Sequence, residues 1–247
     1  MKVFLCFLLL CSIGIAQDKQ TTPLVLVGGG SIPKDAVEWI KNKCTIKKFL
    51  VITCNPEASI KKWSPHFDLE VCLPENTSKV DLSLIGGIII EGGDQWNYIT
   101  RLDKMFIENA YKSGKPIIAT SAGAQILGQF CFTAQEGSIS SEEALADSPK
   151  IHLLNFLNIE SLVDTFVDTH FTERDRFDRL KVFMRKSGVK RGYGIDEATA
   201  LCIHEKLEVK GAGRVTVVNE TSVEVLVPQE ELIVKADEVS NISTQVK

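Results

Sequence analysis

The chain has 247 residues, of which 44% are hydrophobic and 24% charged, so it is long enough for one α/β domain with a substantial core; two smaller domains are the alternative. Its formal net charge of −4, with no stripe of basic residues, argues against nucleic acid as a partner. No Cys/His spacing matches a zinc site, so we expect no metal, and we expect no cofactor. Five cysteines follow residue 16, an odd number that argues against a disulfide framework: Cys44, Cys54, Cys72, Cys131 and Cys202.

Residues 1–16 have the pattern of a secretory signal peptide. Lys2 precedes an apolar stretch, and Gly14-Ile15-Ala16 is a small-residue cleavage site. The apolar stretch is too short to span a membrane. We therefore expect cleavage before Gln17 and a secreted or periplasmic protein that has no membrane attachment afterwards. The alternative is a lipoprotein modified at Cys11, which is disfavoured because the preceding residue is normally small and here is leucine.

Short, continuous apolar runs predict buried strands in the first part of the chain. They lie at residues 23–27, 48–54, 69–72 and 85–90, with helix-length polar segments between them. This alternation favours an α/β fold with a mostly parallel sheet flanked by helices on both faces. The first run ends in Gly28-Gly29-Gly30, which lacks the spacing of a phosphate-binding loop and is interpreted as a tight turn near a substrate pocket.

Two glycines, Gly92 and Gly93, follow the run at residues 85–90 and precede Asp94. Apolar residues at helical spacing then predict one amphipathic helix that continues through Ala110. Glycines at the carboxyl end of a buried strand allow a ligand to approach the backbone closely, and ligands of open α/β sheets bind at that edge. The alternative is a plain loop in which Asp94 caps the helix.

Residues 116–128 form an apolar run that ends in small residues around Ser121. The pattern predicts a strand, a sharp turn and a helix. In a nucleophile elbow, the positions two before and two after the serine must be small, and Ala119 and Gly123 satisfy this. The N–H of Ala122 would then be placed to hold a developing oxyanion. The alternative is that Ser121 only caps the helix, since serine is a favoured N-cap.

The pattern weakens over residues 132–153, which predicts a surface loop beside the pocket. An apolar strand over residues 162–169 then ends at His170. A helix is expected to start at Thr172, a plausible cap followed by acidic residues. His170 is therefore expected at the carboxyl edge of a strand.

Residues 192–203 predict one strand entered after two glycines. Adjacent strand residues face opposite ways, so only one of Asp196 and Glu197 can face a given partner. Short alternating runs from Leu207 onward predict a β-rich closing region, and the tail over residues 235–247 is polar.

Four motifs in this order resemble the family of serine peptidases that contains cyanophycinase and dipeptidase E. They lie at residues 92–95 (GGDQ), 120–124 (TSAGA), 168–174 (DTHFTER) and 194–200 (GIDEATA), and the resemblance spans about residues 24–203. It implies a class I glutamine amidotransferase-like fold, a flavodoxin-like three-layer sandwich with a β-rich carboxyl-terminal region. Residues 17–234 would then form a single catalytic α/β domain.

The resemblance also implies roles for individual residues. Ser121 would be the nucleophile, His170 the general base and Glu197 the acid that orients it, a set whose chemistry agrees with the elbow pattern. The N–H groups of Gly93 and Ala122 would form the oxyanion hole.

Four further residues match family positions that line the substrate pocket: Gln95, Asp168, Thr169 and Arg174. The implied substrate is a peptide, cyanophycin or another aspartyl peptide, cleaved at β-aspartyl-arginine linkages. Arg174 would bind the carboxylate and Asp168 the guanidinium. Thr169 departs from the glutamine usual at its position.

Two other functions remain open at this point. One is an α-aspartyl dipeptidase, which shares the elbow, and the other is a catalytically silent binding module of the same fold. The complete Ser/His/Glu set argues against the second. The sequence leaves the oligomeric state undecided and is compatible with a homodimer.

Overall fold

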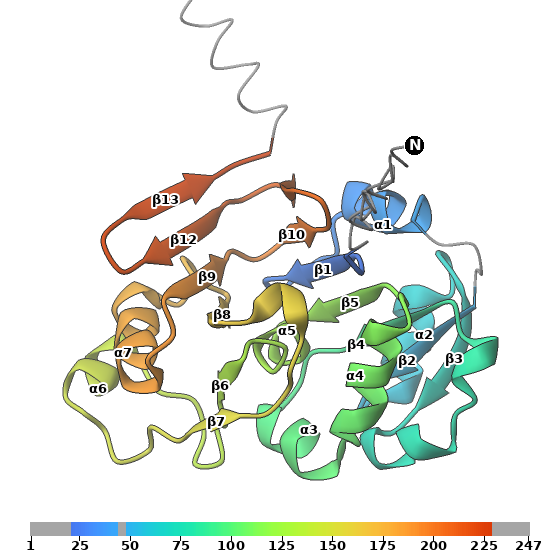
Figure 1. Cartoon of the computed structure of the whole chain (residues 1–247), viewed down its shortest axis with the longest axis horizontal. Helices are drawn as coiled ribbons and strands as arrows, with labels where there is room; N and C mark the ends of the chain where they lie inside the picture. The colour runs from blue at the N-terminus through green and yellow to red at the C-terminus, as the bar shows by residue number, and fades with distance from the viewer. Residues whose placement is uncertain (1–20, 44–47, 229–247) are drawn as a thin grey trace, which may run out of the picture.

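The computed structural model of the chain describes residues 21–43 and 48–228 (Figure 1). The predicted signal peptide at residues 1–16, the polar tail at 235–247 and Cys44 lie outside the described residues. Within the described ranges, no helix is long and apolar enough to cross a membrane, and Cys54, Cys72, Cys131 and Cys202 are free.

A seven-stranded sheet with the order β11-β10-β1-β5-β4-β2-β3 contains the predicted parallel strands. The five strands from β1 to β3 in that order are parallel, whereas β10 pairs antiparallel with β1 and β11 pairs antiparallel with β10. The strands are β1 (Leu24–Val27), β2 (Lys48–Ile52), β3 (Asp68–Cys72), β4 (Gly87–Ile90), β5 (Ile117–Thr120), β10 (Thr199–Ile203) and β11 (Leu207–Gly211).

Both faces of this sheet are buried, which explains why its strands are continuous apolar runs. Alternate residues of β1 belong to different core clusters: Val25 and Val27 pack with α1 (Lys34–Lys41) and with Trp63, the last residue of α2 (Pro56–Trp63). Leu24 and Leu26 face the opposite cluster. That cluster includes side chains from α3 (Gln95–Arg101), α4 (Lys104–Lys112) and α5 (Ala122–Gln125).

A second sheet of six strands, with the order β13-β12-β9-β8-β6-β7, packs beside the first (Figure 1). Its strands are β6 (Phe130–Phe132), β7 (Leu153–Asn155), β8 (Thr165–Thr169), β9 (Arg191–Ile195), β12 (Val215–Asn219) and β13 (Val223–Leu226). Val167, Ile195 and Val215 join the core of the first sheet. Phe166 and Val218 pack with α7 (Phe177–Ser187) and with Ala144 of α6 (Ser141–Leu145).

The α/β class and the β-rich carboxyl-terminal part are as predicted, but the strand predicted over residues 192–203 is wrong in detail. β9 and β10 belong to different sheets, and the turn between them places Ala198 at φ +50°. The chain therefore crosses from one sheet to the other at residues 196–198. Short 3₁₀ helices cover Pro74–Lys79, Leu82–Leu84 and Glu160–Leu162.

Three helix predictions also need correction. The helix expected from Gln95 through Ala110 is interrupted, because Leu102 is extended and Asp103 accepts a hydrogen bond from the Met105 N–H at 3.0 Å, starting α4. The surface loop expected over residues 132–153 contains α6, where the Ser140 and Glu143 side chains form a capping box.

The helix expected from Thr172 instead begins at Phe177. Asp175 has φ +46°, and the N–H of Arg174 bonds to the carbonyl of His170 in an isolated turn before the helix.

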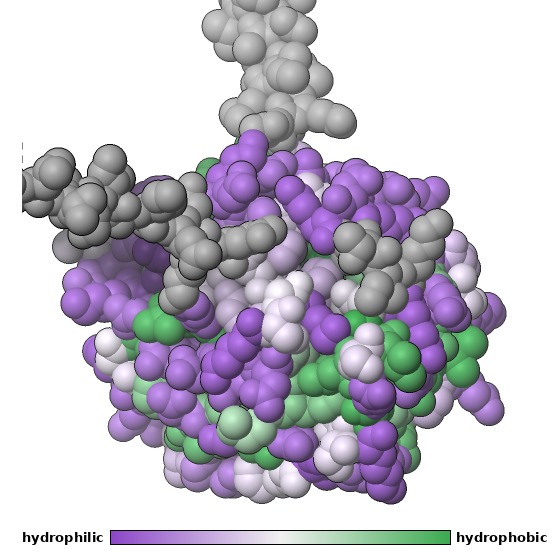
Figure 2. Space-filling view, turned by 45° about the vertical axis from the view of Figure 1, so that its right-hand side comes forward, coloured by the Kyte–Doolittle hydropathy of each residue, from purple (hydrophilic) through white to green (hydrophobic). Residues whose placement is uncertain are grey.

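Hydrophilic residues dominate the upper part of the surface seen in Figure 2, and apolar residues gather in patches lower down.

Candidate active site

Ser121 stands at the sharp turn between β5 and α5. Its backbone has φ +49° and ψ −116°, and its N–H donates to the carbonyl of Val27 at 2.9 Å. A Cβ at Gly123 would lie 2.4 Å from the carbonyl oxygen of Ile90, so the position two residues after Ser121 has no room for a side chain. The Ser121 side chain makes no capping hydrogen bond to α5, so the N-cap alternative does not describe this turn.

The side chains of Ser121, His170 and Glu197 lie in one hydrogen-bonded line. Ser121 Oγ is 2.8 Å from His170 Nε2, and His170 Nδ1 is 2.5 Å from Glu197 Oε1. A carboxylate accepts the Nδ1 proton, which leaves Nε2 as an acceptor for the serine hydroxyl. The arrangement can therefore activate the hydroxyl as a nucleophile.

These three residues come from different parts of the fold. Ser121 follows β5 of the first sheet, His170 follows β8 of the second sheet, and Glu197 lies where the chain passes between the sheets. The line of side chains therefore joins the two sheets.

His170 is mostly buried, with 12% of its side chain exposed. Burial lowers the pKa of His170 below its ordinary 6.5; the hydrogen bond to Glu197 opposes this, and the positive charges of Arg174 and Arg176 reinforce it. The neutral imidazole, which can accept a proton, is thus favoured.

The glycines after β1 surround the imidazole and the carboxylate. A Cβ at Gly29, which has φ +114°, would lie 2.2 Å from His170 Cε1, and one at Gly30 would lie 3.3 Å from Glu197 Cβ. The carbonyl of Gly28 accepts the His170 N–H at 2.8 Å. Sequence reasoning placed these glycines near a pocket but did not predict that they make room for His170.

The second glycine loop lies beside the serine. A Cβ at Gly92 would be 3.3 Å from Ser121 Cβ, and Gly93 is exposed with φ +149°. Tyr98 donates a long hydrogen bond of 3.5 Å to the carbonyl of Gly92. Ala122 is the first residue of α5 and is buried. Of the two predicted oxyanion residues, Ala122 directly follows the serine in the chain, and Gly93 follows the glycine that lies against it.

Asp168 lies away from solvent, in the centre of an ion cluster. Arg179 Nε donates to its Oδ2 at 3.0 Å and Arg179 Nη2 to its Oδ1 at 2.5 Å. Oδ1 also accepts from Gln125 Nε2 at 2.7 Å and from Arg176 Nη1 at 3.3 Å. Burial alone would raise the pKa of Asp168, but the two guanidiniums outweigh it and hold the pKa below its ordinary value.

The expectation that Asp168 binds a substrate cation directly therefore needs correction. Its carboxylate is fully buried and both oxygens are occupied by internal donors. Asp168 is instead the counter-ion of Arg176 and Arg179, two arginines that sequence reasoning missed. The sequence held a signal that these two arginines are buried. Arg176 stands four residues before Leu180, and Arg179 four residues before Phe183, both apolar residues of α7.

The other predicted pocket residues adjoin this cluster. Gln95 Nε2 donates to Gln125 Oε1, which connects the second glycine loop to Asp168. Thr169 is fully buried, and within the described part of the chain its Oγ1 has no hydrogen-bond partner. Arg174 is exposed.

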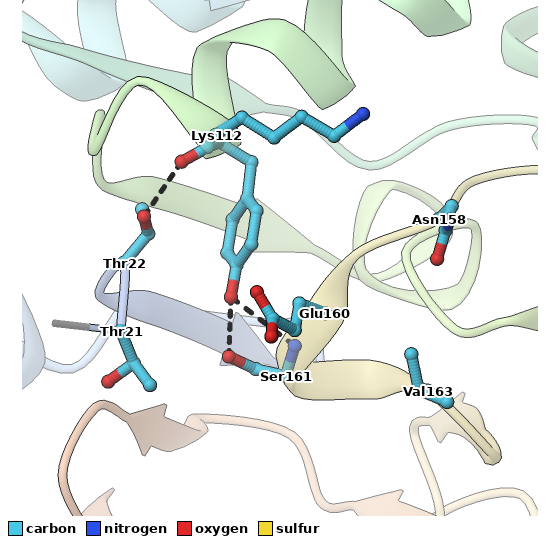
Figure 3. Close-up of a pocket in the computed structure, with 8 residues that line it drawn as sticks. Thr21, Thr22, Lys112, Asn158, Glu160, Ser161 and Val163 are labelled. Carbon is cyan, nitrogen blue, oxygen red and sulfur yellow. Dashed lines mark hydrogen bonds between the residues drawn. The ribbon is translucent and has the colours of Figure 1, made fainter. Parts of the chain in front are cut away.

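The cavity shown in Figure 3 does not belong to this site. Residues 21–43 and 48–228 contain no group of three His, Cys, Asp or Glu side chains that could hold a metal ion. The cavity of about 610 Å³ in Figure 3 is lined by Thr22, Tyr111 and Ser161, among others, at the end of β1 opposite to the glycines.

Residues 74–209 match the model of peptidase family S51. Cyanophycinases of Synechococcus elongatus and of Thermosynechococcus vestitus are each 34% identical to the chain over 146 residues, which is 56% of this chain and 43% of the relative. The cyanophycinase of Nostoc sp. is 27% identical over 150 residues, 58% of this chain and 48% of the relative. The matches thus span less than half of the length of these relatives.

Solved structures show a similar fold. A peptidase from an acI-B1 actinobacterium superposes with a TM-score of 0.62 at 20% identity, covering 85% of this chain and 95% of that one. A structure from Listeria monocytogenes EGD-e gives a TM-score of 0.52 at 20% identity, covering 78% of this chain and 99% of that one. At this level of identity the likeness concerns the fold.

Proposed function

Because the chain belongs to peptidase family S51, we propose that it is a serine peptidase in which Ser121, His170 and Glu197 act as a catalytic triad. The observation that carries this proposal is the hydrogen-bonded line from Ser121 Oγ through His170 to Glu197 Oε1, with distances of 2.8 and 2.5 Å. A serine hydroxyl attacks a carbonyl only when a base removes its proton, and the line supplies that base.

The proposed reaction begins when His170 Nε2 accepts the proton of Ser121 Oγ as this oxygen bonds to the carbonyl carbon. The N–H groups of Gly93 and Ala122 stabilise the negative charge on the carbonyl oxygen. His170 then gives its proton to the nitrogen of the leaving amine, and the C–N bond breaks. Water, deprotonated by His170, hydrolyses the acyl-enzyme and frees Ser121.

Glu197 keeps the proton of the imidazole on Nδ1 and stabilises the imidazolium that forms during the attack. Its side chain is 39% exposed, whereas that of His170 is 12% exposed. The carboxylate is therefore in contact with water while the base is shielded from it.

We propose that the substrate is a β-aspartyl peptide whose free carboxylate lies toward the arginine cluster. Arg176 and Arg179 share one carboxylate, Asp168, so one buried positive charge has no counter-ion within the cluster, and the exposed Arg174 adds another nearby. This net positive charge favours an anionic group of the substrate at the exposed Arg174. The cyanophycinases among the relatives support a β-aspartyl-arginine linkage.

Thr169 departs from the glutamine that the resemblance implies at its position, but its side chain is fully buried and therefore does not contact the substrate. We propose the β-aspartyl linkage as the recognised feature and arginine as the preferred leaving residue.

The test is to incubate the purified protein with β-aspartyl-arginine and with α-aspartyl-arginine and to follow both products by mass spectrometry, with Ser121→Ala as the control. We expect hydrolysis of the β-linked dipeptide and much slower hydrolysis of its isomer. Preference for the α-linked dipeptide would identify an α-aspartyl dipeptidase. No hydrolysis of either, together with no reaction of Ser121 with a fluorophosphonate, would indicate a binding module.

We also propose that the protein is exported, on the evidence of the signal-peptide pattern at residues 1–16. The mass of the protein isolated from cell fractions tests this. A secreted or periplasmic form that begins at Gln17 is expected, and an intact chain retained in the cytoplasm would contradict it.

A further inference from the structure

Asp196 is a buried carboxylate beside Glu197 that the proposed reaction does not use. It is 6% exposed, and its Oδ1 accepts the N–H of Thr172 at 3.0 Å. Thr172 is two residues after His170. Oδ2 lies 3.4 Å from the N–H nitrogen of Arg214 and 3.6 Å from its Nε. Asp196, on the Glu197 segment, thus holds the segment that carries His170.

Glu173 makes the reciprocal contact. Its Oε1 accepts the N–H of Glu197 at 3.1 Å, so a side chain of the His170 segment holds the backbone of the triad acid. Two carboxylates therefore join the segments in opposite directions. We call the pair of hydrogen bonds, Asp196 to Thr172 and Glu173 to Glu197, the reciprocal tie.

The tie completes a series of backbone hydrogen bonds around the triad. The N–H groups of His170 and Ala198 donate to the carbonyls of Gly28 and Gly29 at 2.8 and 2.9 Å. Phe171 donates to the carbonyl of Ile195, and Asp196 to that of Arg214, each at 3.2 Å. The remaining two N–H groups, of Thr172 and Glu197, are those that the tie satisfies.

These contacts hold a strained stretch of backbone. His170 and Ala198 have φ +48° and +50°, and non-glycine residues keep such angles only where the surroundings fix them. Loss of one contact would let the Glu197 backbone relax and lengthen the distance from Oε1 to His170 Nδ1. Displacement of about 1 Å at a catalytic group can cost about 100-fold in rate.

We propose that Glu173 and Asp196 are positioning residues whose reciprocal tie sets the geometry between His170 and Glu197; this rests on the proposed triad. Glu173 is exposed, so its charge is largely screened by water and salt, and it acts through the hydrogen bond that its oxygen accepts. Glutamine offers an oxygen at the same place and should therefore replace it, whereas alanine should not.

The first test measures the rate at which a fluorophosphonate inactivates Ser121, which requires the base but no particular peptide. We expect Glu173→Ala to react about 10-fold to 100-fold more slowly than wild type, and Glu173→Gln to stay within about 3-fold. Asp175→Asn removes a charge from the same exposed segment, tolerates the positive φ, and should leave the rate unchanged. Wild-type rates in Glu173→Ala, or equal losses in the Ala and Gln variants, would overturn the proposal.

The second test does not depend on catalysis. NMR of the protein with labelled histidine, assigned with His170→Asn, reports the Nδ1 proton shared with Glu197. We expect Glu173→Ala to move this resonance upfield or broaden it, and Glu173→Gln to preserve it. An unchanged resonance in Glu173→Ala would refute the tie, whereas a wild-type protein with this resonance but an unreactive Ser121 would refute only the proposed function.

Asp196 is tested by the same measurements. Asp196→Asn keeps an oxygen for the Thr172 N–H and should retain the Nδ1 resonance, while Asp196→Ala should lose it. Because the carboxylate is buried, the alanine variant is first compared with wild type by thermal unfolding, and the two Glu173 variants decide the proposal if it fails to fold. A preserved resonance in a folded Asp196→Ala variant would contradict the proposal.

Discussion

The two sheets hold their parts of the candidate site by different forces. The first sheet places Ser121 at the end of β5, a strand buried on both faces among aliphatic side chains. The second places His170 at the end of β8, whose last residues include the buried polar side chains of Asp168 and Thr169. Apolar packing thus fixes the serine side, whereas paired charges stabilise the histidine side.

The difference shows which substitutions should separate activity from stability. The hydroxyl of Ser121 contributes little to packing, so its removal tests chemistry alone. The carboxylate of Asp168 pairs with Arg176 and Arg179 and neutralises these buried cations, so its removal tests the framework that supports His170. The predictions that follow use this contrast, beginning with the largest expected effect.

Ser121→Ala should reduce kcat for the β-aspartyl dipeptide by about a million-fold, because loss of a triad nucleophile has an effect of that size. The free energy of unfolding should change little, since the side chain makes no cap and leaves only a small space. Steady-state kinetics and urea unfolding measure the two. Residual activity close to wild type would mean that another residue attacks.

Asp168→Ala should lower the free energy of unfolding by about 3–5 kcal/mol, because it leaves Arg176 and Arg179 buried without a counter-ion. Asp178→Ala is the matched control on α7, since its carboxylate is 48% exposed and pairs with Lys181 at 3.9 Å. Its loss should cost less than about 1 kcal/mol. Equal losses in urea unfolding would remove the proposed contrast between the sheets.

Gly29→Ala should reduce kcat/KM by about 100-fold, because the new methyl group would push the His170 ring from its place. Gly114→Ala is the control: it also has positive φ, at +79°, but a Cβ there meets nothing within 4 Å. Both variants carry backbone strain and should lose stability, but only Gly29→Ala should lose activity in the protein that remains folded. Comparable kinetics in the two folded variants would refute this role of the glycine.

The pH dependence should show the smallest effect. Activity falls on the acid side when His170 takes up a proton, and the midpoint should lie below 6.5 because burial lowers the pKa of this histidine. Arg174→Gln removes a positive charge that lowers this pKa, so the midpoint should rise toward 6.5. Rates of fluorophosphonate inactivation from pH 4 to 8 measure both. A midpoint above 6.5 in wild type would contradict the argument.

The same contrast explains what could be predicted from the sequence. The strands of the first sheet were predictable because burial on both faces requires apolar runs, and the elbow was predictable because its steric demands fall on neighbours of Ser121. The second sheet takes β9 and β12, whereas β10 and β11, which lie between them in the chain, pair in the first sheet. Nothing local in residues 192–203 indicates that β9 and β10 enter different sheets.

The roles of charged residues were the hardest part to predict. Arg174 and Arg176 are two positions apart, yet the first is exposed and the second is 5% exposed. The difference arises from Asp168 and Ser138, which reach Arg176 only in the folded chain. Likewise, alternation predicts that Asp196 and Glu197 face different partners but does not say which one reaches His170.

The central claim is that Ser121 is a nucleophile activated by a histidine from the other sheet. The most direct test treats wild-type protein and a folded His170→Ala variant with a fluorophosphonate and locates the adduct by tandem mass spectrometry. We expect rapid labelling of wild type on the peptide containing Ser121 and labelling slower by at least about 1000-fold in the variant. An adduct on another serine, or equally rapid labelling of the variant, would contradict it.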